Sequence, residues 1–151
     1  MQLIGTSSFR NVIWFSLLAA LLILSISTNS YAASKKELRR VDEKGSVEVV
    51  VVYLNPLGGI EDNQQSFELT LDTHSDDLSN YKLADLSTLK FENGAEIVAS
   101  EWRNQGGGGH HISGTIIFEV SELGDAKYLE LIVKNVGGVE ERIFRWDLPE
   151  Q

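Results

Sequence analysis

Histidine and carboxylate side chains are the groups of this chain best suited to bind an ion or a ligand. The sequence has three histidines and no cysteine, so a transition-metal site would have to use imidazoles and carboxylates. His74 ends the alternating segment FELTLDTHS, in which residues two apart are expected to share one face of a strand. Asp72 and His74 are therefore expected to project from the same side near the strand end. Asp76 and Asp77 follow directly and add carboxylates at the same place.

The other two histidines, His110 and His111, follow four consecutive glycines in the segment NQGGGGHHISG, residues 104–114. Adjacent side chains on a regular strand point to opposite faces, so both imidazoles can reach one ion only if the backbone is irregular. Glycine permits left-handed and bulged conformations. A bulge at 110–111 would aim both imidazoles at His74.

These residues predict a binding site for a divalent transition metal, Cu or Zn. The predicted ligands are His74, His110 and His111, with Asp72 either as a fourth ligand or as the carboxylate that orients a ligand. Two other interpretations stay open. Four glycines are also typical of a flexible exposed loop, and Asp72 and His74 can simply hydrogen-bond each other. The runner-up function is a protein-interaction or adhesion module that uses the glycine loop as a contact surface and holds no metal.

Sequence motifs of the common enzyme classes are missing. The chain has no Gly-x-Ser-x-Gly elbow, no His-Glu-x-x-His pair and no Gly-x-x-x-x-Gly-Lys phosphate loop. A Ser-His-Asp triad can be assembled on paper from Ser75 or Ser113, but almost any secreted domain offers as much. The pair Asp76-Asp77 is more typical of a solvated loop than of a glycosidase. We therefore expect a non-enzymatic protein.

The first 32 residues have the pattern of a secretory signal peptide. One basic residue, Arg10, is followed by an apolar run from Val12 to Ile26 and by the small-residue sequence SYA, which suits cleavage after Ala32. The run is short for a membrane-spanning helix, which needs roughly 20 residues. We predict export to the periplasm or the cell exterior, and an uncleaved N-terminal membrane anchor is the alternative.

The predicted mature chain is strongly acidic. Residues 33–151 hold all 22 acidic residues and 12 of the 13 basic ones, which gives a net charge of −10. This charge disfavours nucleic acid and anionic membrane surfaces as partners. Residues 33–46 alternate in charge and have few apolar side chains, which is typical of a solvated tether. The remaining residues, 47–151, are predicted to form one domain.

Short alternating apolar runs between Gly, Asn and Asp predict an all-β, antiparallel, immunoglobulin-like sandwich of about six to seven strands after the signal peptide. Phe67, Leu69 and Leu71 are expected to face inward, and so are Ile116, Phe118 and Val120. Trp102 and Trp146 are expected to be large core residues. Residues 75–88 are ambiguous between a loop followed by a strand and a short helical turn.

Two hairpins can be predicted with their registers. If Gly137 and Gly138 form a two-residue turn, opposite charges pair on one face and large apolar groups pair on the other. The predicted pairs are Lys134–Glu141, Glu130–Arg145, Leu131–Phe144 and Leu129–Trp146. A three-residue loop at 92–94, with Gly94 in the left-handed region, gives a second set. Those pairs are Phe91–Ala95, Lys90–Glu96 and Leu89–Ile97.

Three stretches of this chain, LDTHSDDL, GGHHISGTIIF and VGGVEERIFRWDL, resemble a group of small exported bacterial domains of unknown function. The resemblance covers most of residues 66–148. It implies an immunoglobulin-like or related sandwich and brings no established activity with it. If the group has a functional centre, the resemblance implies that the matching positions here are Asp72, His74, His110 and His111, with no catalytic role carried over.

Overall fold

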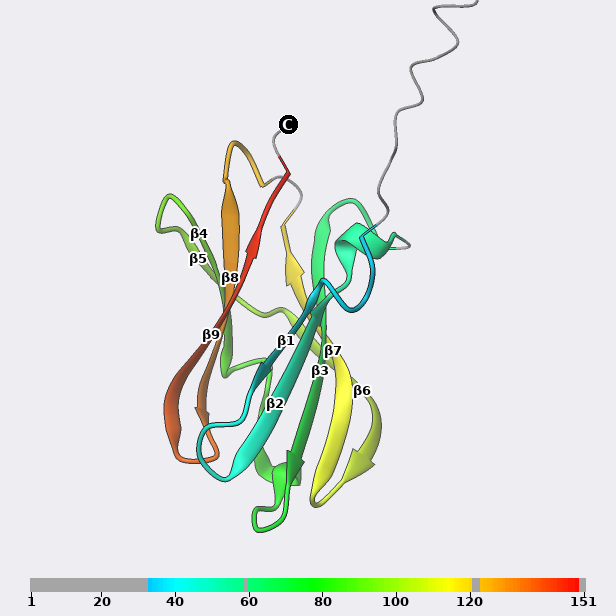
Figure 1. The fold of residues 1–151 in the computed structure, drawn as a ribbon, viewed down its shortest axis with the longest axis vertical. Coiled ribbons are helices and arrows are strands. Elements are labelled where there is room, and N and C mark those ends of the chain that lie inside the picture. The colour runs from blue at the N-terminus through cyan, green and yellow to red at the C-terminus, as the bar shows by residue number, and fades with distance from the viewer. Residues whose placement is uncertain (1–32, 59, 121–122, 150–151) are drawn as a thin grey trace, which may run out of the picture. The chain divides into compact units, whose positions relative to one another are not determined.

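The chain folds into a two-layered β-sandwich (Figure 1). The computed structural model describes residues 33–58, 60–120 and 123–149. These residues form nine strands in two antiparallel sheets, with two short 3-10 helices. The predicted fold class is therefore confirmed. The predicted signal peptide, residues 1–32, lies outside the described residues, and no helix within the described part is long and apolar enough to cross a membrane.

Sheet A contains five strands in the order β1-β2-β3-β7-β6, and sheet B contains four in the order β5-β4-β8-β9. This order matches the immunoglobulin arrangement, with β2-β3-β7-β6 as one sheet and β4-β8-β9 in the other. The strand bounds in sheet A are β1 Arg39–Asp42, β2 Val47–Tyr53, β3 Gln64–Thr73, β6 Glu101–Gly108 and β7 His111–Glu119. Those in sheet B are β4 Ser87–Phe91, β5 Glu96–Val98, β8 Tyr128–Val136 and β9 Val139–Asp147. The 3-10 helices are η1 Asn55–Leu57 and η2 Leu78–Asn80.

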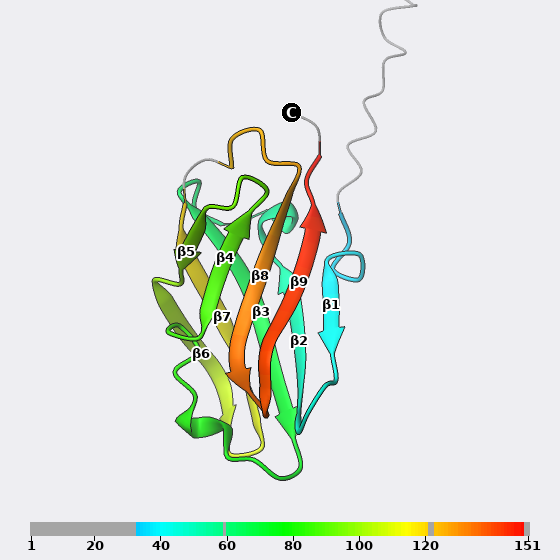
Figure 2. The ribbon, with the colours of Figure 1, turned by 90° about the vertical axis from the view of Figure 1, so that its left-hand side faces the viewer.

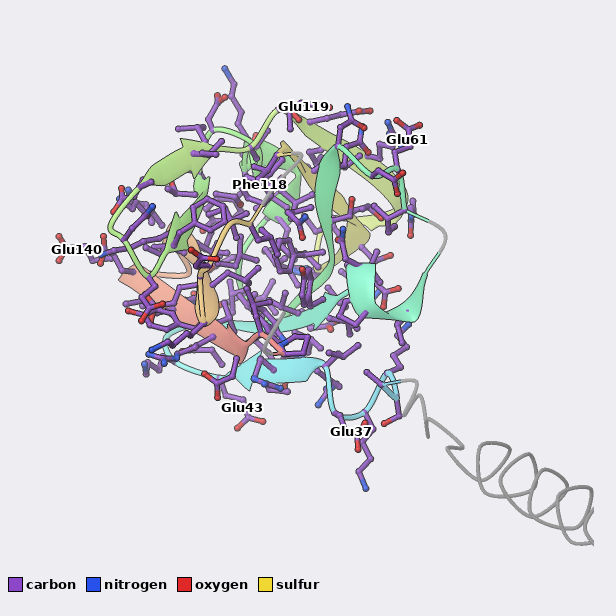
Figure 3. The ribbon with its side chains drawn as sticks, turned by 90° about the horizontal axis from the view of Figure 1, so that it is seen from above. Glu37, Glu43, Glu61, Phe118, Glu119 and Glu140 are labelled. Carbon is purple, nitrogen blue, oxygen red and sulfur yellow. The ribbon has the colours of Figure 1, made fainter. Side chains whose placement is uncertain are left out.

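The core lies between the two sheets and follows from the period-two alternation of the strands. Figure 3 looks along the sandwich and shows side chains filling the space between the sheets, with Phe118 inside and the labelled glutamates at the periphery. All six residues predicted to face inward are buried. Trp146 is also buried, whereas Trp102 is only partly buried and packs against the core. The Trp102 ring lies over Gly114, where an added Cβ would come within 2.7 Å of it.

Both predicted hairpins are confirmed with their registers. Strands β8 and β9 pair as the sequence predicted, from Leu129 opposite Trp146 to Lys134 opposite Glu141. The turn residues Gly137 and Gly138 have φ angles of 60° and 76°. In the second hairpin Lys90 pairs with Glu96, and Gly94 has a φ of 84°.

The strand count of six to seven is wrong, since the described residues form nine strands, and one reason is a change of sheet between β5 and β6. The chain leaves sheet B after Val98 and enters sheet A at Glu101. Ala99 donates its N–H to Ser87 in sheet B, and Ser100 donates its N–H to Ile117 in sheet A. These two residues therefore divide the segment 96–108 into β5 and β6. Within the ambiguous stretch the structure has η2, a turn and then β4.

The prediction of a solvated tether at residues 33–46 is wrong for its second half. Residues 39–42 form β1, which pairs with β2. Some charged residues of this segment find partners in the sandwich, whereas others, such as Lys36 and Arg39, are exposed to solvent. Arg40 lies 5.4 Å from the centre of the Trp146 ring, and the Trp146 indole N–H donates to the Leu38 carbonyl over 2.7 Å.

The strongest of these contacts is a buried ion pair between β1 and β9. The Arg142 side chain is 0% exposed, and its guanidinium donates to the Asp42 carboxylate. It also donates to the backbone carbonyls of Lys44 and Val136. Burial alone raises the pKa of Asp42, but hydrogen bonds from Lys44 and the positive charges of Arg142 and Lys44 outweigh burial. The pKa of the Asp42 carboxyl therefore lies below its ordinary 3.8.

Replacing Asp42 with asparagine is expected to lower the free energy of unfolding by roughly 3–5 kcal/mol at neutral pH, because it leaves the Arg142 charge buried without an anion. Since the pKa is lowered by folding, the contribution of the carboxylate is present above its unfolded pKa of 3.8 and is lost as the pH falls below it. The stability gap between wild type and Asp42→Asn should therefore narrow below about pH 4.

Urea unfolding followed by tryptophan fluorescence across the acidic range measures this gap. Asp125→Asn, a change at an exposed turn residue, is the matched control and is expected to have little effect at any pH. A gap that stayed constant into acid would contradict the assigned role of the Asp42 charge.

Candidate functional site

The two histidine-bearing segments meet at one end of sheet A. Strands β3 and β7 are neighbours, and their register sets Asp72 opposite His111. Figure 1 shows the end of β3, helix η2 and the β6–β7 turn together at the lower end of the sandwich. Residues that are nearly forty positions apart in the sequence therefore share one small region, as the sequence analysis expected.

His111 is the first residue of β7 and projects from the outer face of sheet A. Its Nδ1 contacts Oδ1 of Asp72, and the two side chains are 55% and 47% exposed. An ionised carboxylate can only accept a hydrogen bond, so the neutral imidazole carries its proton on Nδ1. This assignment leaves Nε2 of His111 with a lone pair.

His110 occupies the turn before β7 and points elsewhere. Its Nδ1 lies 2.9 Å from the backbone carbonyl oxygen of Asp76. A carbonyl oxygen also only accepts, so the neutral His110 ring takes the same tautomer as His111. The expected bulge at 110–111 is wrong: the register shift lies between Asn104 and Gly106.

Backbone hydrogen bonds fasten the turn that carries His110 to the end of β3 and to η2. Thr73 donates its N–H to the His110 carbonyl over 3.0 Å, and Leu78 donates to the Gly109 carbonyl over 2.7 Å. Gly109 in turn donates its N–H to the Ser79 hydroxyl over 3.1 Å. The segments DTHSDDL and GGHH thus form one hydrogen-bonded unit.

The glycines shape this unit. Gly106, Gly107 and Gly108 belong to β6 and pair with β7, which favours a shaped backbone over the flexible-loop interpretation. Gly107 has a φ of 85°, and an added Cβ would lie 2.1 Å from the His111 carbonyl oxygen. Gly109 has a φ of 62° at the first position of the two-residue turn, the position where a type II′ turn prefers glycine.

His74 is exposed just beyond the end of β3. It lines a pocket of about 260 Å³ together with Gly45, Ser46, Glu48, Asp72, Thr73 and Ser75. Glu48 is the cross-strand neighbour of Asp72 on β2. The alternative interpretation, a hydrogen bond between Asp72 and His74, differs from the structure, in which the Asp72 carboxylate contacts His111.

Carboxylates give this end of the sandwich a negative character. Hydrogen bonds from Ser79 are the largest cause that lowers the pKa of the Asp77 carboxyl, and the charge of His110 lowers it further. The Asp76 carboxylate accepts a hydrogen bond from the Ser46 hydroxyl. The sequence analysis named Asp76 as a nearby carboxylate but did not single out Ser79. The short spacing of Ser79 from His74 was the available signal.

The four predicted ligands lie at one end of the sandwich but do not form a closed cage. Within residues 33–58, 60–120 and 123–149, no group of three or more histidine, aspartate or glutamate side chains is placed to hold a metal ion. The structure brings Asp72 and His111 into contact and directs His110 toward Asp76. The metal site remains a prediction.

Comparisons with protein-family models, with curated proteins and with solved structures found no match to this chain. The resemblance to small exported domains therefore stays a prediction, and a functional assignment has to rest on the geometry of the residues themselves.

Substitution of Gly107 by alanine is expected to destabilise the protein by roughly 1–3 kcal/mol, because a left-handed φ is costly for residues other than glycine and the new Cβ would collide with the His111 backbone. Gly108→Ala is the matched control, since no atom lies within 4 Å of its added Cβ and its φ is not positive. Thermal unfolding monitored by circular dichroism compares the two. Equal destabilisation would show that the strained conformation of Gly107 is not needed.

Proposed function

We propose that the protein is an exported, non-enzymatic binding domain that takes up a divalent transition metal, Cu or Zn, through His110 and His111. His74, exposed at the same end, is a further candidate ligand. Asp72 acts in this proposal as the orienting carboxylate rather than as a ligand, because its carboxylate is already engaged by His111.

One observation carries this proposal. Both adjacent imidazoles have Nδ1 next to an oxygen that can only accept, a carboxylate for His111 and a backbone carbonyl for His110. Histidines that bind metals through Nε2 commonly donate their Nδ1–H to such a carboxylate or carbonyl, which fixes the ring and the tautomer.

The choice of metal follows from the donor atoms. Imidazole nitrogens suit Zn and Cu, whereas Mg and Ca prefer sites made entirely of oxygen. The neighbouring carboxylates and the acidic chain, with a formal net charge of −9, would raise the local concentration of cations. Water or His74 would complete the coordination of an ion held by two histidines.

Export and the lack of catalysis are parts of the proposal supported by the sequence. The leader pattern of residues 1–32 supports delivery to the periplasm or the cell exterior. The site contains no cysteine, and no motif of the common hydrolases or phosphate-binding enzymes is present in the sequence. In this proposal the two exposed histidines therefore bind the metal, and the metal takes part in no catalytic reaction.

The alternative function, a protein-interaction module, is favoured by a different surface. Val98 and Ile143 are 60% and 56% exposed, and both lie on the outer face of sheet B. Such a surface suits another protein chain rather than an ion.

Cu(II) or Zn(II) is expected to stabilise the protein, because only the folded chain holds both imidazoles with Nδ1 against an oxygen acceptor and Nε2 available to a metal. At a free metal concentration of about 100 times Kd the gain should be about 2.7 kcal/mol. It should be smaller at pH 5 than at pH 7, because protons compete with the metal for imidazole nitrogens. Thermal unfolding with and without metal at both pH values measures the gain. A His110→Ala/His111→Ala double variant that responds to metal as wild type does would refute the site.

Asp72→Ala is expected to weaken metal binding by about 10–100-fold, which is the usual effect of removing a carboxylate that orients a metal-bound histidine. Glu68→Ala is the matched control, since Glu68 is a carboxylate on the same face of the same strand and pairs with Lys35 instead. Isothermal titration calorimetry with Zn(II) measures both affinities. If the two variants bind equally well, Asp72 does not position His111 for a metal.

A further inference from the structure

The outer face of sheet B is open to a partner. Figure 2 looks onto this face and shows β5, β4, β8 and β9 side by side, with no other described element in front of them. The register of these four strands places their outward side chains in rows that run across the sheet. Two adjacent rows make up the candidate docking surface, an apolar row and a charged row.

The apolar row crosses the middle of the face. Val98 on β5 pairs with Thr88 on β4, Thr88 pairs with Ile132 on β8, and Ile132 pairs with Ile143 on β9. The two central residues are buried, whereas Val98 is 60% and Ile143 is 56% exposed. Both ends of the row thus present β-branched apolar side chains to solvent.

The charged row lies one step away, two residues along each strand. Glu96 pairs with Lys90, Lys90 pairs with Glu130, and Glu130 pairs with Arg145. Its signs alternate from β5 to β9 as minus, plus, minus, plus. The ion pairs inside the row are long, 3.8 Å from Lys90 to Glu96 and 3.9 Å from Arg145 to Glu130. Arg145 also pairs with Asp147 on its own strand over 3.3 Å, and such pairs between exposed side chains contribute little free energy.

This alternation makes the face complementary to itself. A two-fold axis can lie midway between two stacked copies of sheet B. It then runs parallel to the strands and passes between β4 and β8. The axis lays β5 over β9 of a second copy and β4 over β8. In the charged row it sets Glu96 against Arg145 of the second copy and Lys90 against Glu130 of the second copy, so that every position meets the opposite sign. In the apolar row it sets Val98 against Ile143 of the second copy.

We infer that a second copy of this chain docks on the outer face of sheet B and forms a two-fold symmetric dimer. A two-fold contact uses the same patch on both chains, so it needs a surface that matches its own reversed image. Stacked sheets with nearly parallel strands give the geometry, about 10 Å apart. Two chains of net charge −9 repel each other overall. Dimerisation therefore depends on the local pairing of opposite charges in this contact.

Arg145 has a contact that prepares it for this role. Its guanidinium lies 3.5 Å from the centre of the Tyr128 ring, on the same outer face. This stacking limits the orientations of a long side chain, so less conformational entropy is lost when Arg145 meets a carboxylate of the second copy. The dimer does not involve His110 or His111 and does not rest on the proposed metal site.

The first test measures self-association by analytical ultracentrifugation, with EDTA present so that metal plays no part. The protein is expressed from its full coding sequence and purified in the form that the host accumulates. Wild type should form dimers, and Ile143→Lys should raise the dimer Kd at least about tenfold. Leu57→Lys is the control, because Leu57 is 41% exposed but lies on η1. A wild type that stays monomeric to millimolar concentration, or an Ile143→Lys dimer of unchanged Kd, overturns the inference.

The second test reverses the charged row. A variant carrying Glu96→Lys, Lys90→Glu, Glu130→Lys and Arg145→Glu keeps alternating signs within each chain and remains complementary to itself. It should dimerise like wild type. Mixed with wild type it should not form heterodimers, because each position would then meet a like charge. Fluorescence energy transfer between differently labelled chains measures the mixing. Free exchange between the two proteins would show that the row does not lie in the dimer contact.

Discussion

The register between β3 and β7 is the constraint on which the rest of sheet A depends. Leu71 lies opposite Ile112, and both are buried in the core. Because side chains alternate along a strand, a slip by one residue would expose these groups. The same register places the next residue of β3, Asp72, opposite the residue before Ile112, which is His111. Burial of the inner face therefore determines the polar contact on the outer face.

A second constraint closes the side of the sandwich where β1 and β9 lie. The buried guanidinium of Arg142 needs an anion, and the anion comes from Asp42. A charge buried in this way is costly to leave unpaired, so the N-terminal segment is held on the sandwich although its composition resembles that of a solvated linker. Trp146 adds a hydrogen bond to the same segment. The polar residues of β1 thus act as structural groups.

The two sheets support two different kinds of binding surface. In sheet A, a turn anchored by backbone hydrogen bonds presents two imidazoles whose Nδ1 atoms face oxygen acceptors. In sheet B, four aligned strands present rows of side chains whose order is fixed by pairing alone. The metal proposal depends on the chemistry of a few side chains, whereas the dimer proposal depends on the symmetry of an entire face. The two surfaces can therefore be altered separately.

The sequence by itself determined the fold class, the inward-facing residues and both hairpins, because period-two alternation and the φ preferences of glycine are local properties. It also indicated the residues of the candidate site, because in a chain without cysteine a transition-metal site has to use imidazole and carboxylate side chains. Only the tertiary structure decided that β1 joins sheet A, that the segment 96–108 serves both sheets, and that His110 contacts Asp76 while His111 contacts Asp72. Each of these depends on contacts between residues far apart in the chain, and such contacts leave no periodic pattern in the sequence.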